Sequence, residues 1–466
     1  MKRLANIILG SSLLLSGCTM APKYARPSLP VPDAWPESAI STPAPAEVPA
    51  PNELPWRDYF TDTKLRSVIE LALSNNRDLR VAALNVQKAQ ALFRIQRAEL
   101  TPSVGVMADG QKYRLPEKMT SDGVAQIVEQ YSVNLSTLSW ELDLFGRVRS
   151  LKDTALNQYL ATDQARNAAQ ISLVAAVANT YLTLAADREN LALAKSTLEA
   201  QRTSYDLIRS SLDAGIASDL DLRQAQSQVD AARVDMARYT GFVAANENAL
   251  DLLVGVHVAP DMLPGALGDV GEMKAISAGL HSEILLRRPD IMAAEYLLRG
   301  ANANIGAARA AFFPRISLTA GLGTMSPELS GLFDSGTRTW SFTPQIVAPL
   351  FAGGSVLANL KAAKVDRDIA VAQYEKAIQS AFREVSDSLV FRTTLMDQED
   401  AQRSLVGALD ESYRLSEARY KEGIDGYLGV LVNQRALYVA QRGFVSVRLA
   451  RVINQVDIYK VLGGGA

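Results

Sequence analysis

Histidine and cysteine are almost absent from this chain of 466 residues, which has two histidines, His257 and His281, and one cysteine, Cys18. A Ser-His-Asp or Cys-His nucleophile system would have to use one of these histidines. Neither lies near a nucleophile elbow or at a metal-ligand spacing, and we interpret both as ordinary surface or capping residues. The sequence therefore argues against an enzyme, and we expect no cofactor and no resident metal.

A surplus of charge of one sign is missing too. The 48 Lys and Arg residues nearly balance the 50 Asp and Glu residues, the net charge is −2, and the charges are evenly spread. Nucleic-acid binding leaves a basic footprint, so we expect no nucleic-acid partner. No uninterrupted apolar run after residue 18 is long enough for a transmembrane helix. An exported chain can still cross a membrane as β-strands, provided that every strand edge is closed.

The first 17 residues have the composition of a secretory signal peptide. Two basic residues precede an apolar stretch from Leu4 to Leu15, which is too short to span a bilayer as a helix. The stretch runs into Leu15-Ser16-Gly17-Cys18, which resembles a bacterial lipobox. We therefore predict a signal peptide over residues 1–17 and lipidation of Cys18; the alternative is a plain signal peptide with an incidental cysteine. By the same resemblance, Thr19 after the cysteine favours the outer membrane.

Proline is concentrated directly after this segment, because residues 22–55 hold ten of the nineteen prolines. Proline fixes φ and removes a backbone donor, so the composition predicts an extended chain and not a packed element. We predict a lipid-anchored, proline-rich tether over residues 18–56.

The rest of the chain repeats itself. At an offset of 208 residues, nine positions are identical: Tyr205/Tyr413, Leu207/Leu415, Gly215/Gly423, Ile216/Ile424, Leu220/Leu428, Gln226/Gln434, Ala232/Ala440, Asn246/Asn454 and Gly255/Gly463. At an offset of 212, Asp78, Arg97, Ala98 and Pro102 match Asp290, Arg309, Ala310 and Pro314. The shared order predicts an internal duplication: a first repeat over residues 57–255, a connecting segment over 256–280 and a second repeat over 281–463.

Each repeat has the same sequence of periods. A helical stretch (79–100 and 291–312) ends before a proline, and two segments with period-2 alternation follow, near 103–109 and 131–135 in the first repeat and near 316–323 and 340–346 in the second. Next comes a stretch without proline or glycine, Arg147 to Ala214, which as a helix would be about 100 Å long. It carries apolar residues at spacings of three and four, and 355–422 matches it. Gly215 and Gly423 end these helices, and return helices follow near 219–254 and 425–462.

The number of strands decides how such a chain could cross a membrane. Four strands with one apolar and one small or polar face suit a transmembrane barrel, but about eight strands are the practical minimum for closure. Several copies are therefore required, and three would give twelve strands. The alternative is a solid periplasmic coiled-coil adaptor with a soluble β-subdomain.

Three motifs carry a family resemblance: Trp140-Glu141-Leu142-Asp143-Leu144-Phe145-Gly146-Arg147, Arg288-Pro289-Asp290-Ile291 and Ala307-Ala308-Arg309-Ala310-Ala311-Phe312-Phe313-Pro314. The chain resembles the TolC-like outer-membrane efflux proteins along essentially its whole length, and most of all their lipoprotein branch, typified by OprM. The resemblance implies a mainly α fold with a transmembrane β-barrel. The barrel is a homotrimeric, twelve-stranded one with four strands per chain, on a long periplasmic α-helical tunnel.

The resemblance also implies a function and partners. The protein would be the outer-membrane channel of a tripartite efflux pump, passively conducting drugs and other toxic small molecules. It would contact outer-membrane lipid, a periplasmic adaptor (membrane fusion protein) and an inner-membrane pump of the RND class. Protein secretion and metal-ion efflux are the alternatives. The ten methionines are scattered, which does not favour a soft-metal relay.

By the same resemblance, the tunnel closes at its periplasmic end, where hydrogen bonds and ion pairs hold the helix tips together until the inner helix pair rotates outward. Asp221 matches the gating aspartate of the family and Tyr420 its gating tyrosine. Leu428 falls at a constricting apolar position, and Arg435 at a gate arginine.

One position departs from this pattern. Three residues before Arg435, where the branch usually has an aspartate, this chain has Val432. Asp425 or Asp221 could then pair with Arg435. Asp221 could instead be only a residue favoured at a helix N-terminus, and Tyr420 only a residue of the helical seam.

Overall fold

The computed structural model describes residues 19–36, 54–276 and 281–464. The predicted signal peptide and Cys18 lie outside these ranges. Contacts divide the chain into two compact units: unit 1 comprises residues 1–28, 85–163 and 293–374, and unit 2 comprises 29–84, 164–292 and 375–466. Each unit therefore draws on both predicted repeats.

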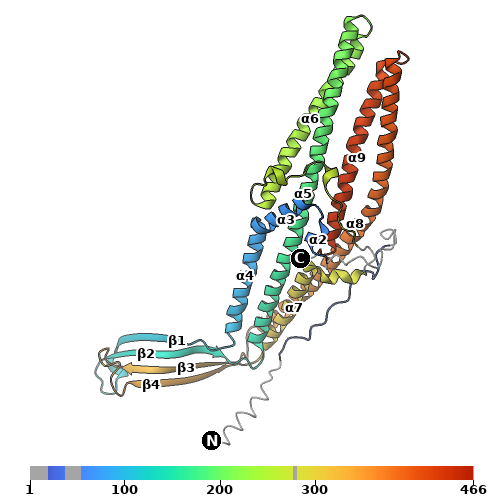
Figure 1. The fold of residues 1–466 in the computed structure, drawn as a ribbon. Coiled ribbons are helices and arrows are strands. Elements are labelled where there is room, and N and C mark those ends of the chain that lie inside the picture. The colour runs from blue at the N-terminus through green and yellow to red at the C-terminus, as the bar shows by residue number, and fades with distance from the viewer. Residues whose placement is uncertain (1–18, 37–53, 277–280, 465–466) are drawn as a thin grey trace. The chain divides into compact units, whose positions relative to one another are not determined.

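The element order is that of a duplicated chain (Figure 1). After α2 (Trp56–Tyr59) and α3 (Thr63–Asn75), the first half has α4 (Arg77–Ala98), β1 (Gly105–Leu115), β2 (Gln126–Glu141), α5 (Arg147–Asp213) and α6 (Asp219–Val254). The second half has α7 (Pro289–Ala310), β3 (Arg315–Ser326), β4 (Arg338–Val347), α8 (Ser355–Lys421) and α9 (Tyr427–Val461). Short 3₁₀ helices lie at Glu117–Met119, Pro260–Met262, Leu267–Asp269 and Ser282–Arg287.

The bounds of the helices confirm the duplication predicted from the sequence. Helices α5 and α8 are both 67 residues long and are offset by 208 at either end (355 − 147 and 421 − 213). Helices α4 and α7 are both 22 residues long and are offset by 212 (289 − 77 and 310 − 98). The strands are longer than the sequence predicted, because the antiparallel pairing continues through polar and charged residues near the loops, for example between Lys112 and Glu129.

The four strands of unit 1 form one antiparallel sheet in the order β1-β2-β3-β4, so β1 and β4 are its free edges in a single chain. Paired residues share a face of a sheet, and the register separates two faces. One row of the register contains only apolar side chains, all of them exposed: Val106, Leu135, Leu322 and Trp340. On the opposite face Ser132 donates to Asp109 at 2.6 Å, and Asn134 donates to Ser132 at 2.9 Å. The sheet thus has one apolar and one polar face, as predicted.

Unit 1 also contains parts of four helices, and these lie side by side in chain order, as the strands do. Phe93 of α4 stacks on Tyr159 of α5 with a centroid distance of 6.4 Å. Thr154 of α5 donates to the carbonyl oxygen of Gly300 in α7 at 3.2 Å. Apolar side chains of α7 and α8 form a cluster that contains Ile305 and Ala363. The helical layer is therefore α4-α5-α7-α8, with α4 and α8 at its edges.

The Trp140–Arg147 motif forms the joint between β2 and α5. Asp143 accepts hydrogen bonds from the backbone N–H groups of Val148 and Arg149 at 3.1 and 2.9 Å, which caps the long helix. Arg147 binds both carboxylate oxygens of Glu141, at 2.7 to 3.2 Å. Gly146 adopts φ +75°, a conformation that a residue with a Cβ rarely takes. This motif is structural.

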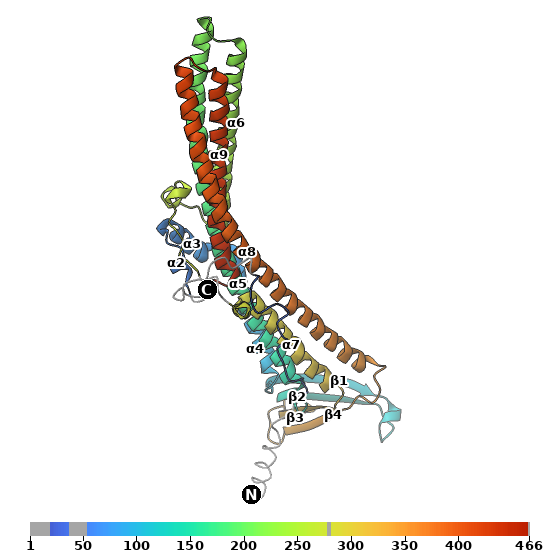
Figure 2. The same cartoon turned by 90° about the vertical axis from the view of Figure 1, so that its right-hand side faces the viewer.

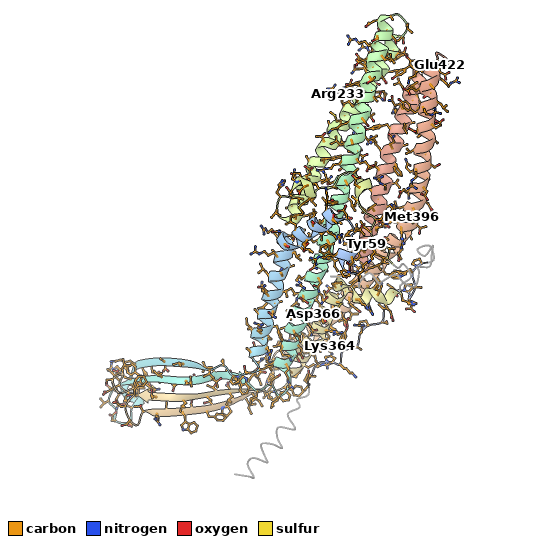
Figure 3. The ribbon with its side chains drawn as sticks, in the orientation of Figure 1. Tyr59, Arg233, Lys364, Asp366, Met396 and Glu422 are labelled. Carbon is orange, nitrogen blue, oxygen red and sulfur yellow. The ribbon has the colours of Figure 1, made fainter. Side chains whose placement is uncertain are left out.

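The core of unit 2 joins the N-terminal helices to the last helix. Tyr59, labelled in Figure 3, stacks on Tyr459 with a centroid distance of 4.2 Å and donates to the carbonyl oxygen of Gln455 at 2.7 Å. Arg288, from the second family motif, is buried; it donates to the carbonyl oxygen of Val461 at 2.7 Å and forms an ion pair with Glu384.

One helix among the described residues, α5, is long and apolar enough in composition to cross a membrane, although it has no uninterrupted apolar run. Of its most apolar window, 56% is buried. Val177, Tyr181 and Leu184 of this helix are fully buried in unit 2, so we assign its apolar residues to the core of that unit.

Candidate functional site

The predicted gate residues lie near two turns that connect helices of unit 2, one between α5 and α6 and one between α8 and α9 (Figure 2). Gly215 and Gly423 have φ +76° and +70°. The N–H groups of Ile216 and Ile424 each donate back five residues, to Ser211 and Arg419, at 2.8 and 2.9 Å. Both turns are therefore Schellman-type ends, which the two glycines allow.

Asp221 closes the first turn of α6. Its side chain accepts from the backbone N–H of Ser218 at 3.0 Å and from the Ser218 hydroxyl at 2.6 Å, while the Asp221 N–H donates to Ser218 Oγ at 3.2 Å. This is a capping box. The hydrogen bonds from the Ser218 hydroxyl and backbone keep the pKa of Asp221 below its usual value. Within one chain, the carboxylate thus has a capping role.

Tyr420 packs between the two helical hairpins. Its ring lies 5.1 Å from the ring of Tyr427, centroid to centroid. Both rings belong to one apolar cluster, which also contains Ile208 and Ala225 of the first hairpin and Leu431 of the second. Tyr420 is therefore a seam residue within the chain.

Asp425 has a partner that the sequence analysis did not identify. It binds Arg419 across the turn at 2.5 and 3.2 Å. The hydrogen bond from Arg419 lowers the pKa of Asp425, and the same bond raises the pKa of Arg419. Glu422, labelled in Figure 3, marks this turn. The sequence contains little indication of this ion pair. Arg419 and Asp425 are six residues apart, which is not a helical spacing, and they meet only because of the glycine turn between them.

Leu428, Val432 and Arg435 lie together on one stripe of α9, at spacings of four and three residues. Leu428 and Val432 are 56% and 58% exposed, and Arg435 is exposed as well. Val439 continues the stripe and is 59% exposed. Among the described residues, Arg435 forms no ion pair, whereas Asp221 and Asp425 bind Ser218 and Arg419. A single chain thus presents an apolar stripe with one cation in it.

The residues that follow Cys18 form a second structured feature, in unit 1. Met20 and Pro22 accept hydrogen bonds through their carbonyl oxygens, from Arg309 at 3.1 Å and from Asn302 at 2.8 Å. These residues of the predicted tether form no helix or strand, but they dock onto α7, because their carbonyl oxygens have donors there.

One ionic cluster, which we call the arm clasp, holds this segment. Glu295 of α7 is only 5% exposed and accepts from Arg26 at 2.8 and 3.1 Å, from Tyr24 at 3.1 Å and from Arg299 at 2.6 Å. Burial raises the pKa of Glu295, but the hydrogen bonds from Arg26 and Arg299 outweigh burial and leave the pKa below its usual value. Proline content alone could not reveal the clasp.

Comparison with known proteins gives a consistent result. Residues 68–256 and 280–464 each match the family described as outer membrane efflux protein. The chain is 46% identical over 455 residues to the toluene efflux pump outer membrane protein TtgC and to the antibiotic efflux pump outer membrane protein ArpC, both from Pseudomonas putida. Each of these alignments covers 98% of this chain and 94% of the relative. The structure of the open state of the MtrE outer membrane channel from Neisseria gonorrhoeae superposes with a TM-score of 0.87 at 37% identity, covering 96% of this chain and 98% of that one.

Proposed function

Because the chain belongs to the outer membrane efflux protein family, we propose that it acts as a passive duct and performs no catalysis of its own. As a member of this family it is the outer-membrane channel of a tripartite efflux pump. It is a trimer whose twelve-stranded barrel takes four strands from each copy and continues into a periplasmic helical tunnel.

The sheet of unit 1 is the observation that carries the duct. It has an apolar face, a polar face and two free edges. Open edges are not tolerated in lipid, so three sheets that join edge to edge enclose a pore lined by the polar face. Such a pore supplies a path but no driving force.

The substrates that we propose are antibiotics and toluene, which stand in the names of the relatives ArpC and TtgC. The pump that drives them would be of the RND class, joined through a periplasmic adaptor. Metal-ion efflux and protein secretion are less well supported, since neither activity is in the name of these relatives.

Complementation tests this assignment. In a Pseudomonas putida strain that lacks its toluene-efflux outer-membrane protein, the chain should restore tolerance to toluene and to antibiotics. The same strain without its inner-membrane pump should stay sensitive, because a passive duct supplies no driving force. Correctly assembled trimers that restore neither tolerance would refute the proposed substrates.

We also propose that the stripe of α9 forms the periplasmic gate of the trimer. The proposed residues of this gate are Asp221, Tyr420, Asp425, Leu428 and Arg435. With Val432 in place of the usual acid, three copies would bring apolar side chains together, and closure would depend more on Leu428 and Val432 than on ion pairs.

Lipidation of Cys18 is a further part of the proposal. Met20 is held on Arg309, and two residues of extended chain span at most about 7 Å. An acylated Cys18 would therefore insert its chains close to the end of α7.

The proposed limits of the two repeats stay at residues 57–255 and 281–463.

A further inference from the structure

The segment that follows β4 exposes two large apolar residues almost completely. Leu350 is 98% and Phe351 is 93% exposed. Isolated apolar residues at a surface are ordinary, but two adjacent ones with almost no contact to their own chain are not. They lie in unit 1 between the end of β4 at Val347 and the start of α8 at Ser355.

The duplicated segment in the first half is less exposed than the segment after β4. At the offset of 208 that relates α5 to α8, Leu142 corresponds to Leu350. Leu142 is only 36% exposed, and nearby Phe145 stacks on Phe313 with a centroid distance of 4.7 Å. The first segment lies in the middle of the sheet, after β2, whereas the second follows the edge strand β4. What would cover Leu350 and Phe351 is therefore absent from a single chain.

Closure of the barrel determines what comes next to this edge. In a barrel of three sheets with the order β1-β2-β3-β4, β4 of one copy must pair with β1 of the next. The pair is antiparallel, so residues that follow β4 lie beside residues that precede β1. The helical layer is arranged in the same way: α8, which follows β4, lies at one edge, and α4, which precedes β1, lies at the other (Figures 1 and 2).

A cavity of about 510 Å³ lies at the corresponding place on the β1 side. Its apolar part is lined by Ile95 of α4 and by Leu138 and Trp140 at the base of β2, next to Thr101 and Ser103 just before β1. Its polar part is lined by charged residues, Glu99, Glu141, Arg147 and Arg315. Ile95 is 65% and Leu138 54% exposed. A single chain thus has an exposed apolar pair at one edge and an open, partly apolar cavity toward the other edge.

We propose that Leu350 and Phe351 of each copy insert into this cavity of the next copy and contact Ile95, Leu138 and Trp140. The cavity is incomplete without the second copy, and the trimer contains three such sockets. Gly353 and Gly354, with φ +56° and +82°, turn the chain into α8 directly after the inserted residues. The socket fixes the joint between strand and helix at each chain boundary, as the Trp140–Arg147 motif does inside the chain.

Crosslinking between copies tests the proposal. Phe351→Cys combined with Ile95→Cys, treated in membranes with a mild oxidant or a short bismaleimide, should give covalent dimers and trimers on a denaturing gel. Phe351→Cys alone should not. Phe333→Cys with Ile95→Cys is the matched control, because Phe333 is also exposed (77%) but lies in the β3–β4 loop.

Two outcomes would overturn the socket. One is the absence of any Phe351–Ile95 product in trimers whose assembly is verified by native mass spectrometry. The other is strong quenching of a bimane label on Phe351→Cys by brominated lipid, which would place the segment in the bilayer. As a second measurement, Leu350→Ser with Phe351→Ser should lower the temperature at which the trimer dissociates, while Phe333→Ser should leave it unchanged.

Discussion

Replacing Glu295 by Gln should release the segment after Cys18 from α7. Glu295 is the buried centre of the arm clasp, and it binds Arg26, Arg299 and Tyr24 simultaneously. Glutamine keeps the shape but removes the charge, so two guanidinium groups lose their counterion. The helix retains its own packing, and we expect the unit to stay folded while the segment detaches more often.

The size of the effect follows from the exposure of the partners. A hydrogen bond to a charged group contributes about 1.5–3 kcal/mol, but the side chains of Arg26 and Arg299 are 47% and 39% exposed, and solvent screens exposed ion pairs. We therefore expect a loss of about 1–2 kcal/mol, which raises the detached fraction by roughly 5- to 30-fold.

Limited proteolysis measures this fraction. Lys23 is exposed and lies inside the docked segment, so trypsin should cut between Lys23 and Tyr24 only when the segment detaches. When detachment is fast compared with cleavage, the rate follows the detached population. Glu70→Gln is the matched control, because its partner Arg57 and Glu70 itself are both more than 60% exposed. An unchanged cleavage rate for Glu295→Gln in folded trimers would refute the clasp.

The pH dependence gives an independent reading. The pKa of Glu295 is lowered in the folded chain, so its contribution to docking is complete above the usual glutamate value of about 4.3. The contribution is lost as the pH falls through the lower pKa that Glu295 has in the folded chain. The hydrogen-exchange protection of residues 19–28, relative to the intrinsic exchange rate at each pH, should persist at pH 5 and fall only below about pH 4. Loss of this protection already at pH 6 would contradict the assignment.

Three further predictions concern the lipid and the gate. Mass spectrometry of the mature N-terminal peptide should show several acyl chains on Cys18; an unmodified cysteine or another mature N-terminus would refute lipidation. Asp221→Ala combined with Tyr420→Phe should raise single-channel conductance in planar bilayers and admit large antibiotics. Ser218→Ala removes the helix cap, at a cost of about 1 kcal/mol in helix stability, but keeps the Asp221 carboxylate, so it should not raise the conductance. Equal conductance in the wild type, the double mutant and Ser218→Ala would show that the gate lies elsewhere. Val432→Asp should lower the conductance of the closed channel if Arg435 of a neighbouring copy is within reach, and Val432→Asn, which lacks the charge, is its control.

The sequence by itself determined the architecture of this protein. Prolines and glycines mark the ends of the elements, and period-2 and heptad patterns distinguish strands from helices. The duplication could be read from identities at fixed offsets, because both halves must form the same supersecondary unit. The predicted return helix of the first half, 219–254, agrees with α6, and that of the second, 425–462, with α9 to within two residues at either end.

The tertiary structure decided which side chains meet. The partners of Glu295 lie 269 residues away at Arg26 and 4 residues away at Arg299, and no local pattern connects the first of these. Asp425 binds Arg419 across the turn at Gly423, whose geometry depends on a left-handed glycine and not on helical spacing. The near-complete exposure of Leu350 and Phe351 goes with the position of β4 at the sheet edge, because Leu142, which follows the central strand β2, is 36% exposed and Leu350 is 98% exposed. Periodicity determines the face of an element, but contacts depend on how distant segments pack.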